Sequence, residues 1–106
     1  MLNHYGEVQP NLLKHAAGFP AQRELTAVVA PGVAGYGLAA TGKGKNTAGS
    51  DLLVKAIEQS TDANKPLYIN LWGGANTLAQ ALKDLSTRHP ASTVNALTQN
   101  LVVYAI

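Results

Sequence analysis

A chain of 106 residues is long enough for one domain at most. Charged residues make up only 13% of it, against about 25% in ordinary globular proteins, and the net charge of +2 includes no basic cluster larger than Lys43 and Lys45, which argues against a nucleic-acid-binding surface. The absence of cysteine excludes disulfides, zinc–thiolate sites and thiol nucleophiles.

So little charge leaves a free-standing small protein short of solubilising groups, and it is more typical of a segment of a larger protein. The first residues lack the basic and apolar regions of a secretory signal. No apolar run approaches the roughly 20 residues that a membrane span needs. The sequence therefore predicts no membrane partner and leaves the cellular location open.

Two short helices are predicted near the start of the chain. Asn11 to Ala17 has Pro10 before it, which suits a first helical turn, and Gly18 after it, which ends a helix. Ala21 to Ala30 is expected to form the second helix. Its β-branched residues leave a strand over Leu25 to Ala30 as the alternative.

The segment from Gly32 to Gly49 is the most irregular part of the sequence. It contains Gly32, Gly35, Gly37, Gly42, Gly44 and Gly49. Such a density of glycine predicts positive φ angles or a loop that approaches something closely. Long loops of this kind in small domains are often functional, and the alternative is a disordered linker.

The second half of the chain is predicted to alternate between helices and strands. The expected elements are a helix over Asp51 to Gln59, a strand over Leu67 to Trp72, helices over Thr77 to Leu85 and Ala91 to Gln99, and a strand over Leu101 to Ile106. Ser50 and Ser92 are the expected N-caps of the helices that follow them. Thr77 and Gln80 fit a capping box, in which each side chain satisfies a backbone N–H.

Two apolar strands joined by a helical crossover predict a βαβ unit, which is parallel and right-handed. Strands that are apolar along their whole length also predict a sheet covered on both faces. A parallel sheet normally has more than two strands. The predicted fold class is therefore α/β, and we expect the chain to be part of a larger α/β domain.

The chain shows no convincing catalytic set. Gly37 to Gly44 nearly matches the phosphate-binding pattern GxxxxGK[ST], but Gly44 replaces the hydroxyl that would hold Mg²⁺ and no clear strand precedes the loop. The histidines His4, His15 and His89 are far apart and are expected to be solvated or to cap helices. No acidic cluster and no G-x-S-x-G nucleophile context is present.

The strongest candidate site is Trp-Gly-Gly-Ala-Asn-Thr at Trp72 to Thr77. It follows the carboxyl end of a predicted parallel strand, where open α/β sheets bind their ligands. Gly73 and Gly74 bring bare backbone to the surface there. The alternative is a tight turn in which Asn76 acts as a local cap.

This region also carries a family resemblance. The block WGGANTLAQAL, Trp72 to Leu82, resembles the signature of the nucleoside hydrolase-like domain of cellulose-binding proteins, a secreted bacterial family. Tyr5 to Pro20, Gly35 to Ile57 and the closing LVVYAI are similar to consecutive segments of that domain. The resemblance implies that residues 1–106 are a fragment of a three-layer αβα, Rossmann-like parallel-sheet domain, and that the location is secreted or periplasmic, as is typical of the family.

The resemblance further implies a cation site. In nucleoside hydrolases the corresponding strand ends in a Gly-Pro-Leu-Thr-Asn-Leu-Ala block, in which a backbone carbonyl helps to bind a catalytic Ca²⁺. Asn76 occupies the place of that carbonyl donor, and Ca²⁺ accepts backbone oxygens as ligands. The glycine-rich loop would lie near the pocket mouth. The substrate-binding residues expected on this basis are Trp72, Gly73, Gly74 and Tyr36.

The family pattern also contains parts that this sequence lacks. The Asp-rich first strand, which supplies carboxylate ligands and the base, is expected before Met1, and a later Asp ligand is expected beyond Ile106. Metal-assisted attack on a glycosidic carbon needs those carboxylates. We therefore expect no catalytic residue within the chain, and Ca²⁺ is expected to be a cofactor of the complete domain that this chain alone does not bind tightly.

Two functions remain open. The chain is either the central part of a Ca²⁺-dependent glycosyl-bond hydrolase, inactive alone, or a non-catalytic carbohydrate-binding or structural module. Its ligand would be a carbohydrate or a nucleoside-like small molecule, and Trp72, Tyr36 and Tyr68 would stack on it, with core packing as the alternative for Tyr68. The remainder of the parent domain is a further expected partner, and exposed sheet edges predict self-association.

Overall fold

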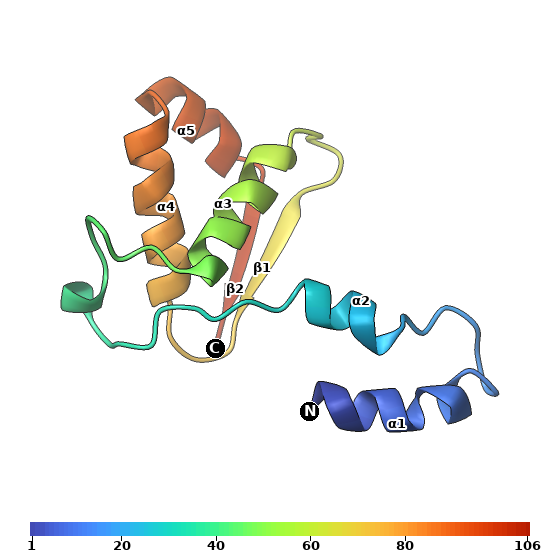
Figure 1. Ribbon diagram of the computed structural model, residues 1–106. Coiled ribbons are helices and arrows are strands. Elements are labelled where there is room, and N and C mark those ends of the chain that lie inside the picture. The colour runs from blue at the N-terminus through green and yellow to red at the C-terminus, as the bar shows by residue number, and fades with distance from the viewer.

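A helical hairpin at the N-terminus projects from a body of three helices and two strands in the computed structural model, which describes all 106 residues (Figure 1). The elements in chain order are α1 (Leu2–Leu12), α2 (Gln22–Ala27), the 3₁₀ turn η1 (Leu38–Ala40), α3 (Ala48–Gln59), β1 (Leu67–Leu71), α4 (Asn76–Arg88), α5 (Ala91–Thr98) and β2 (Leu101–Ala105). The hairpin raises the radius of gyration to 16.3 Å, where about 13 Å is usual for this length. None of the helices combines the length and apolarity required to cross a membrane.

The first helix lies earlier in the chain than predicted. A helix over Asn11 to Ala17 is wrong, because α1 begins at Leu2 and ends at Leu12, with Pro10 inside its last turn. Long-range contacts fix this position: the Tyr5 hydroxyl donates to the Pro20 carbonyl at 2.6 Å. Gly6 lets α2 approach closely, since a Cβ there would collide with the Gln22 side chain.

The second helix is confirmed in preference to the alternative strand. Its start is fixed by Glu24, whose carboxylate accepts from the Ala21 N–H at 2.6 Å. The helix ends at Ala27 rather than Ala30. The β-branched Val28 and Val29 that follow it are exposed.

The third helix begins one turn before its predicted start. Its N-cap is Thr47, whose hydroxyl accepts from the Ser50 N–H at 3.1 Å, while the Ser50 hydroxyl accepts from the Thr47 N–H at 2.8 Å. Ser50 as the N-cap is therefore wrong. Ser50 is instead the third residue of the helix. It and Thr47 each accept from the other's N–H, so the pair satisfies two backbone donors instead of one.

The two strands form a parallel pair, which confirms the predicted βαβ unit. Leu67 lies opposite Leu101, and Leu71 lies opposite Ala105. The core lies between α3 and α4, where Val54 and Ile57 pack against Ala81 and Leu85. Leu67 and Leu101 pack against this cluster from the sheet.

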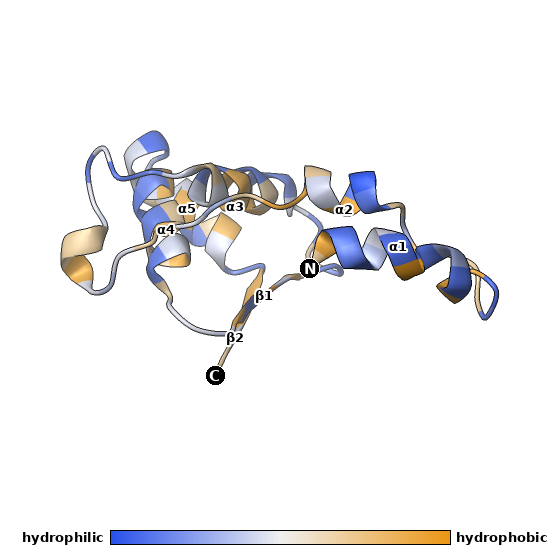
Figure 2. Cartoon of the chain, turned by 60° about the horizontal axis from the view of Figure 1, so that its bottom comes forward, coloured by the Kyte–Doolittle hydropathy of each residue, from blue (hydrophilic) through white to orange (hydrophobic).

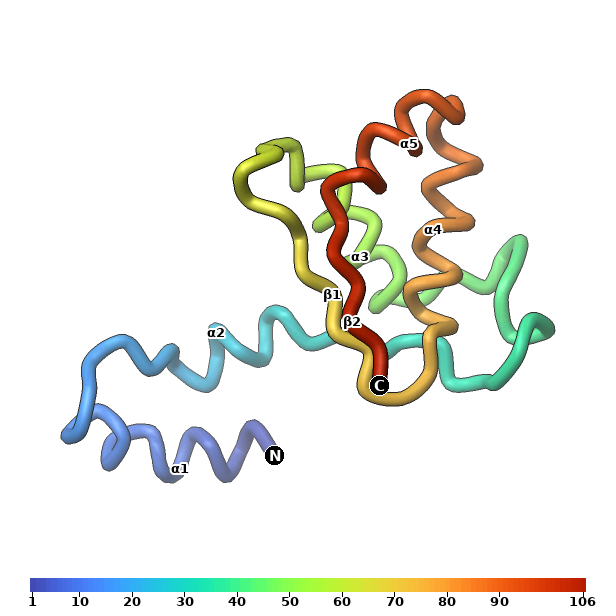
Figure 3. Tube along the Cα trace, turned by 180° about the vertical axis from the view of Figure 1, so that it is seen from behind, coloured from blue at the N-terminus to red at the C-terminus, as the bar shows by residue number.

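All three helices of the body cover the same face of the sheet. Figures 1 and 3 show the sheet behind α3 from one side and in front of it from the other, and Figure 2 shows no helix packed on the opposite face. Alternate residues along the strands, Tyr68, Asn70, Val102 and Tyr104, lie on that opposite face and are exposed. The expected covering of both faces is thus not met within these residues. Core packing of Tyr68 is wrong, because 67% of its surface is exposed.

The last helix begins without a side-chain cap. Pro90 precedes it in an extended conformation, with φ −64° and ψ 155°, so α5 starts at Ala91. Ser92 lies inside the first turn and is not the cap that the sequence predicts. The Pro90 carbonyl accepts from the Thr93 and Val94 N–H groups at 3.0 and 3.1 Å, so the Thr93 donor that a cap hydroxyl could satisfy is already bonded to backbone.

Candidate functional site

The Gly73-Gly74 turn connects the carboxyl end of β1 to the first turn of α4. Trp72 is 79% exposed at its start. Neither glycine has a positive φ angle, and a Cβ added at either would meet no atom within 4 Å. The fold of this chain therefore does not require glycine here, and the two residues leave open space beside bare backbone.

Side chains at the start of α4 hold the glycine-rich loop beside the Gly73-Gly74 turn. The Asn76 side-chain amide donates to the carbonyls of Gly35 and Gly37, at 2.7 and 3.2 Å. The Thr77 hydroxyl accepts from the Val33 N–H at 3.0 Å. Tyr36 is thereby placed next to the Gly73-Gly74 turn, and 92% of its surface is exposed.

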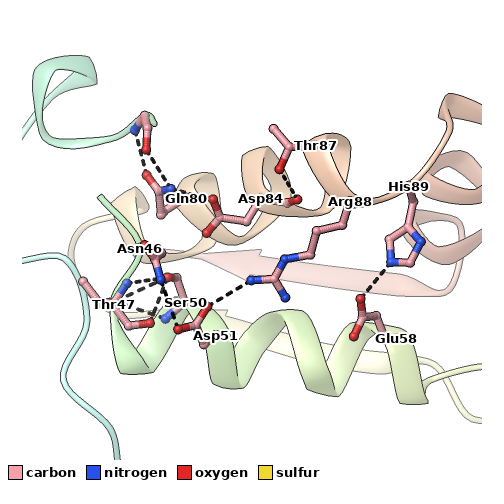
Figure 4. Close-up of polar contacts among 11 residues, drawn as sticks. Asn46, Thr47, Ser50, Asp51, Glu58, Gln80, Asp84, Thr87, Arg88 and His89 are labelled. Carbon is pink, nitrogen blue, oxygen red and sulfur yellow. Dashed lines mark hydrogen bonds and ion pairs between the residues drawn. The ribbon is translucent and has the colours of Figure 1, made fainter. Parts of the chain in front are cut away.

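One turn later, a buried amide anchors the far end of the loop. Gln80 is completely buried. Its Oε1 accepts from the Gly42 N–H at 2.7 Å, and its Nε2 donates to the Gly42 carbonyl at 3.0 Å and to Asp84 Oδ1 at 2.8 Å (Figure 4). Gly42 has a φ of 136°, a conformation that favours glycine.

These contacts overturn one prediction about α4 and decide against one alternative for the loop. The capping box of Thr77 and Gln80 is wrong, because both side chains bond to the distant loop and α4 has no side-chain cap. The loop is not a disordered linker, since α4 holds it at Val33, Gly35, Gly37 and Gly42. A polar pair four residues apart, Gln80 and Asp84, beside an apolar helix face was the signal available in the sequence.

The near-match to a phosphate-binding loop does not form a phosphate cradle. Such a cradle needs free backbone N–H groups and a free lysine. The Gly42 N–H, which such a cradle would need free, is bonded to the buried Gln80 amide. This agrees with the sequence argument against a triphosphatase.

A hollow of about 260 Å³ lies between the loop and the turn. It is lined by Val33, Ala34, Gly35, Tyr36, Gly74, Ala75 and Asn76. The structure therefore brings together three predicted site residues, Tyr36, Gly74 and Asn76. Trp72 and Gly73 belong to the same turn but do not line the hollow.

The residues around the hollow do not fit a Ca²⁺ ion by themselves. Calcium takes six to eight oxygen ligands, with carboxylates among them, and the hollow is lined by none. The chain holds no group of three or more His, Asp or Glu side chains arranged for a metal. Its carboxylates lie elsewhere: Asp51 pairs with Arg88 at 3.2 Å, and Glu58 contacts His89 at 2.8 Å.

Comparison with known proteins identifies two similarities. Residues 1–106 match the family described as cellulose-binding Sde182, nucleoside hydrolase-like domain. Among solved structures, the chain is similar to a nucleoside hydrolase-related hypothetical protein from Saccharophagus degradans that is associated with carbohydrate metabolism, with 38% identity and a TM-score of 0.89. Among curated proteins, none matches the chain.

The solved relative also shows how much of such a protein the chain represents. The alignment covers 98% of this chain and 25% of that one, so the chain spans about a quarter of the relative's length. The predicted α/β fold, as a fragment of a nucleoside hydrolase-like domain, is confirmed.

Proposed function

The chain belongs to the cellulose-binding Sde182, nucleoside hydrolase-like family, and from this premise we propose that the Gly73-Gly74 turn is a saccharide-binding edge. The observation that carries the proposal is the open space beside two glycines that the fold does not require. A ligand that approaches bare backbone needs that space. Trp72, which precedes the two glycines, and Tyr36, which lines the adjoining hollow, are exposed and supply large flat surfaces.

A saccharide suits this arrangement because it has apolar C–H faces and polar edges. The aromatic rings of Trp72 and Tyr36 would pack on the faces. The polar edges would bond to the backbone of Gly73 and Gly74. The Asn76 Oδ1 can accept as well, because only the Nδ2 of that amide is used to hold the loop.

Glycosyl-bond hydrolysis is the second candidate, for a domain of which this chain would be the central part. It is favoured by the nucleoside hydrolase-like description of the family. The proposed contribution of this chain to a Ca²⁺ site is the Asn76 carbonyl, whose second lone pair is available beyond its bond within α4. The carboxylates would have to come from outside these 106 residues, and no catalytic step is assigned to the chain. A secreted location would give such a domain access to insoluble polysaccharide, and a periplasmic location would give it access to soluble oligosaccharides.

The saccharide proposal is tested by retention on insoluble cellulose together with fluorescence. Trp72 is the single tryptophan, so its emission reports directly on the turn. Cellobiose or a longer cello-oligosaccharide is expected to change that emission, with uridine as the nucleoside comparison. Trp72→Ala is expected to lower retention strongly.

The matched control is Tyr104→Ala, which removes an aromatic residue that is 60% exposed on the bare sheet face. Retention should survive this change. Undiminished retention of Trp72→Ala would refute the proposal. Equal loss of retention in both variants would indicate that the binding surface is the exposed sheet face.

A further inference from the structure

A second and larger hollow, of about 640 Å³, lies at the opposite end of the sheet. Its walls are the segment that follows α3, residues 60–63, and one side of α5. Both strands begin beside it, since the Leu67 N–H donates to the Asn100 carbonyl at 2.9 Å. We call it the amino-end hollow, and its size is within the range of small-molecule sites, about 300–1,000 Å³.

The lining combines hydroxyl and amide groups with a larger share of apolar surface, and it carries no charge. It consists of Ser60, Thr61, Ala63, Ser92, Thr93, Ala96, Leu97, Gln99 and Asn100. Six of these nine side chains are hydroxyls or carboxamides, and none is ionisable. A charged ligand would find no counter-charge there, and a purely apolar ligand would strip water from the hydroxyls without replacing its hydrogen bonds.

The walls are fixed before any ligand arrives. The Asn100 amide donates to the carbonyl and the hydroxyl of Ser60, at 2.9 and 2.8 Å, and to the Asp62 carbonyl at 3.2 Å. The Asp62 carboxylate in turn accepts from the Asn64 N–H at 2.9 Å. Such preorganisation lowers the entropy lost on binding.

Several polar groups in the hollow remain free for a ligand. The Nδ2 of Asn100 is engaged with Ser60, whereas its Oδ1 is available as an acceptor. The hydroxyls of Ser92 and Thr93 lie at the start of α5 and the amide of Gln99 near its end. Ser92, Ala96 and Gln99 follow one another at helical spacing, so an apolar floor separates two polar ends.

We propose that the amino-end hollow binds a neutral saccharide of one or two rings, independently of the Gly73-Gly74 turn. The C–H face of a sugar would lie on Ala96 and Leu97. Its hydroxyls would exchange hydrogen bonds with Ser92, Thr93 and the amides of Gln99 and Asn100. A saccharide suits this lining because its hydroxyls match the uncharged hydroxyls and amides, and its C–H face matches the apolar floor.

The test is an NMR titration of the ¹⁵N-labelled 106-residue chain with cellobiose, and with inorganic phosphate as a charged comparison. Cellobiose is expected to shift the amides of residues 60–63 and 92–100, and phosphate to leave them in place. The double variant Ser92→Ala with Thr93→Val should bind at least about fivefold more weakly, because two ligand hydrogen bonds are lost. Ala96→Phe, at an exposed position on the floor, should abolish the response because its ring would cover the surface on which the sugar lies.

Two controls separate this site from the turn. Trp72→Ala should leave the response of the amino-end hollow intact, so the two sites can fail independently. Thr87→Val removes a hydroxyl on α4 that bonds to the Asp84 carbonyl, outside both sites, and it should bind as the parent chain does. The proposal is overturned if cellobiose shifts none of these amides, or if Ala96→Phe, with its thermal unfolding unchanged, responds as the parent chain does.

Discussion

The buried amide of Gln80 and the backbone of Gly42 are hydrogen-bonded in both directions, although 38 residues separate them in the sequence. The two bonds, at 2.7 and 3.0 Å, reproduce the pairing of two backbone strands. Asp84 fixes which way the amide faces, since an ionised carboxylate accepts from the Gln80 Nε2 and cannot donate. Through this contact, α4 positions the loop that carries Tyr36.

Gln80→Glu should therefore lower stability. The new carboxylate would replace the Nε2 donor. Its oxygen would face the Gly42 carbonyl and the Asp84 carboxylate, so three buried acceptors would meet with no donor among them. We expect a loss of about 2 kcal/mol in the free energy of unfolding, or about 10 °C in Tm. Urea and thermal unfolding would measure it, with the exposed Gln59→Glu as the control. Equal effects from the two substitutions would show that the contact with Gly42 contributes nothing.

Asn76→Asp should release the loop while the rest of the chain stays folded. The variant loses the donor to Gly35 and Gly37, and a carboxylate would face two carbonyls. Negative charge at the start of α4 favours the helix dipole, which offsets the loss for the helix itself. Limited trypsin digestion is the measurement, because Lys43 and Lys45 lie in the loop.

Cleavage after those lysines should become several-fold faster in Asn76→Asp. Asn95→Asp, on the exposed side of α5, is the matched control and should be cut at the parental rate. If the loop is cut at the same rate in both variants, the Asn76 amide does not restrain it.

Gly73→Ala and Gly74→Ala should separate binding from stability. An added methyl group meets nothing in this chain, so the free energy of unfolding should stay constant or rise by up to about 1 kcal/mol. Cellulose retention should fall, because the methyl group occupies the space of the ligand. Gly32→Ala is the contrasting variant. Its Cβ would collide with Thr77 and should destabilise the chain by about 1–3 kcal/mol.

Calcium should have little effect on the isolated chain. The hollow at the turn is lined by no carboxylate, and a ligand stabilises a fold only in proportion to ln(1 + [L]/Kd). Millimolar Ca²⁺ is therefore expected to leave Tm within about 1 °C of the value in chelator, because a Kd well above the ligand concentration gives almost no stabilisation. A rise of several degrees that chelator reverses would reveal a ligand set that the structure does not assemble.

The predictions made from sequence succeeded where local pattern decides the structure. The strands at Leu67 and Leu101 and the helix after Asn76 follow from apolar periodicity, glycine and proline. The parallel pairing of the two strands follows from the crossover between them. Ser50 is not the cap because Thr47, three residues earlier, takes that position. The Thr77 prediction is wrong for a different reason. A hydroxyl near a helix start predicts a cap only if no better partner exists, and the Val33 N–H that Thr77 accepts from lies 44 residues away.

The candidate site likewise has one part that local sequence predicts and one part that depends on distant contacts. The Gly73-Gly74 turn could be found because glycines after a strand are visible in the sequence. The placement of Tyr36 beside it depends on Asn76 bonding across 41 residues to Gly35, and no local pattern contains that information. Tyr68 was ambiguous because alternation assigns a residue to a face without saying whether that face is covered.

The bare face and edges of the sheet should make the chain self-associate. Each of the two strands pairs on one side only, which leaves unpaired backbone groups on both edges. Tyr68, Val102 and Tyr104 add exposed apolar surface beside them, and contiguous patches of this kind promote association. Sedimentation velocity across a concentration series should therefore show growth in mass with concentration.

Tyr104→Lys should suppress that growth, since charge on an exposed sheet face opposes close packing of a second copy. Tyr36→Lys is the matched control: it places the same charge at an exposed aromatic position on the loop and should leave association unchanged. A parent chain that sediments as a monomer at every concentration would refute the prediction. If Tyr36→Lys alone restores the monomer, the contact runs through the loop, and the sheet face is not the surface that brings copies together.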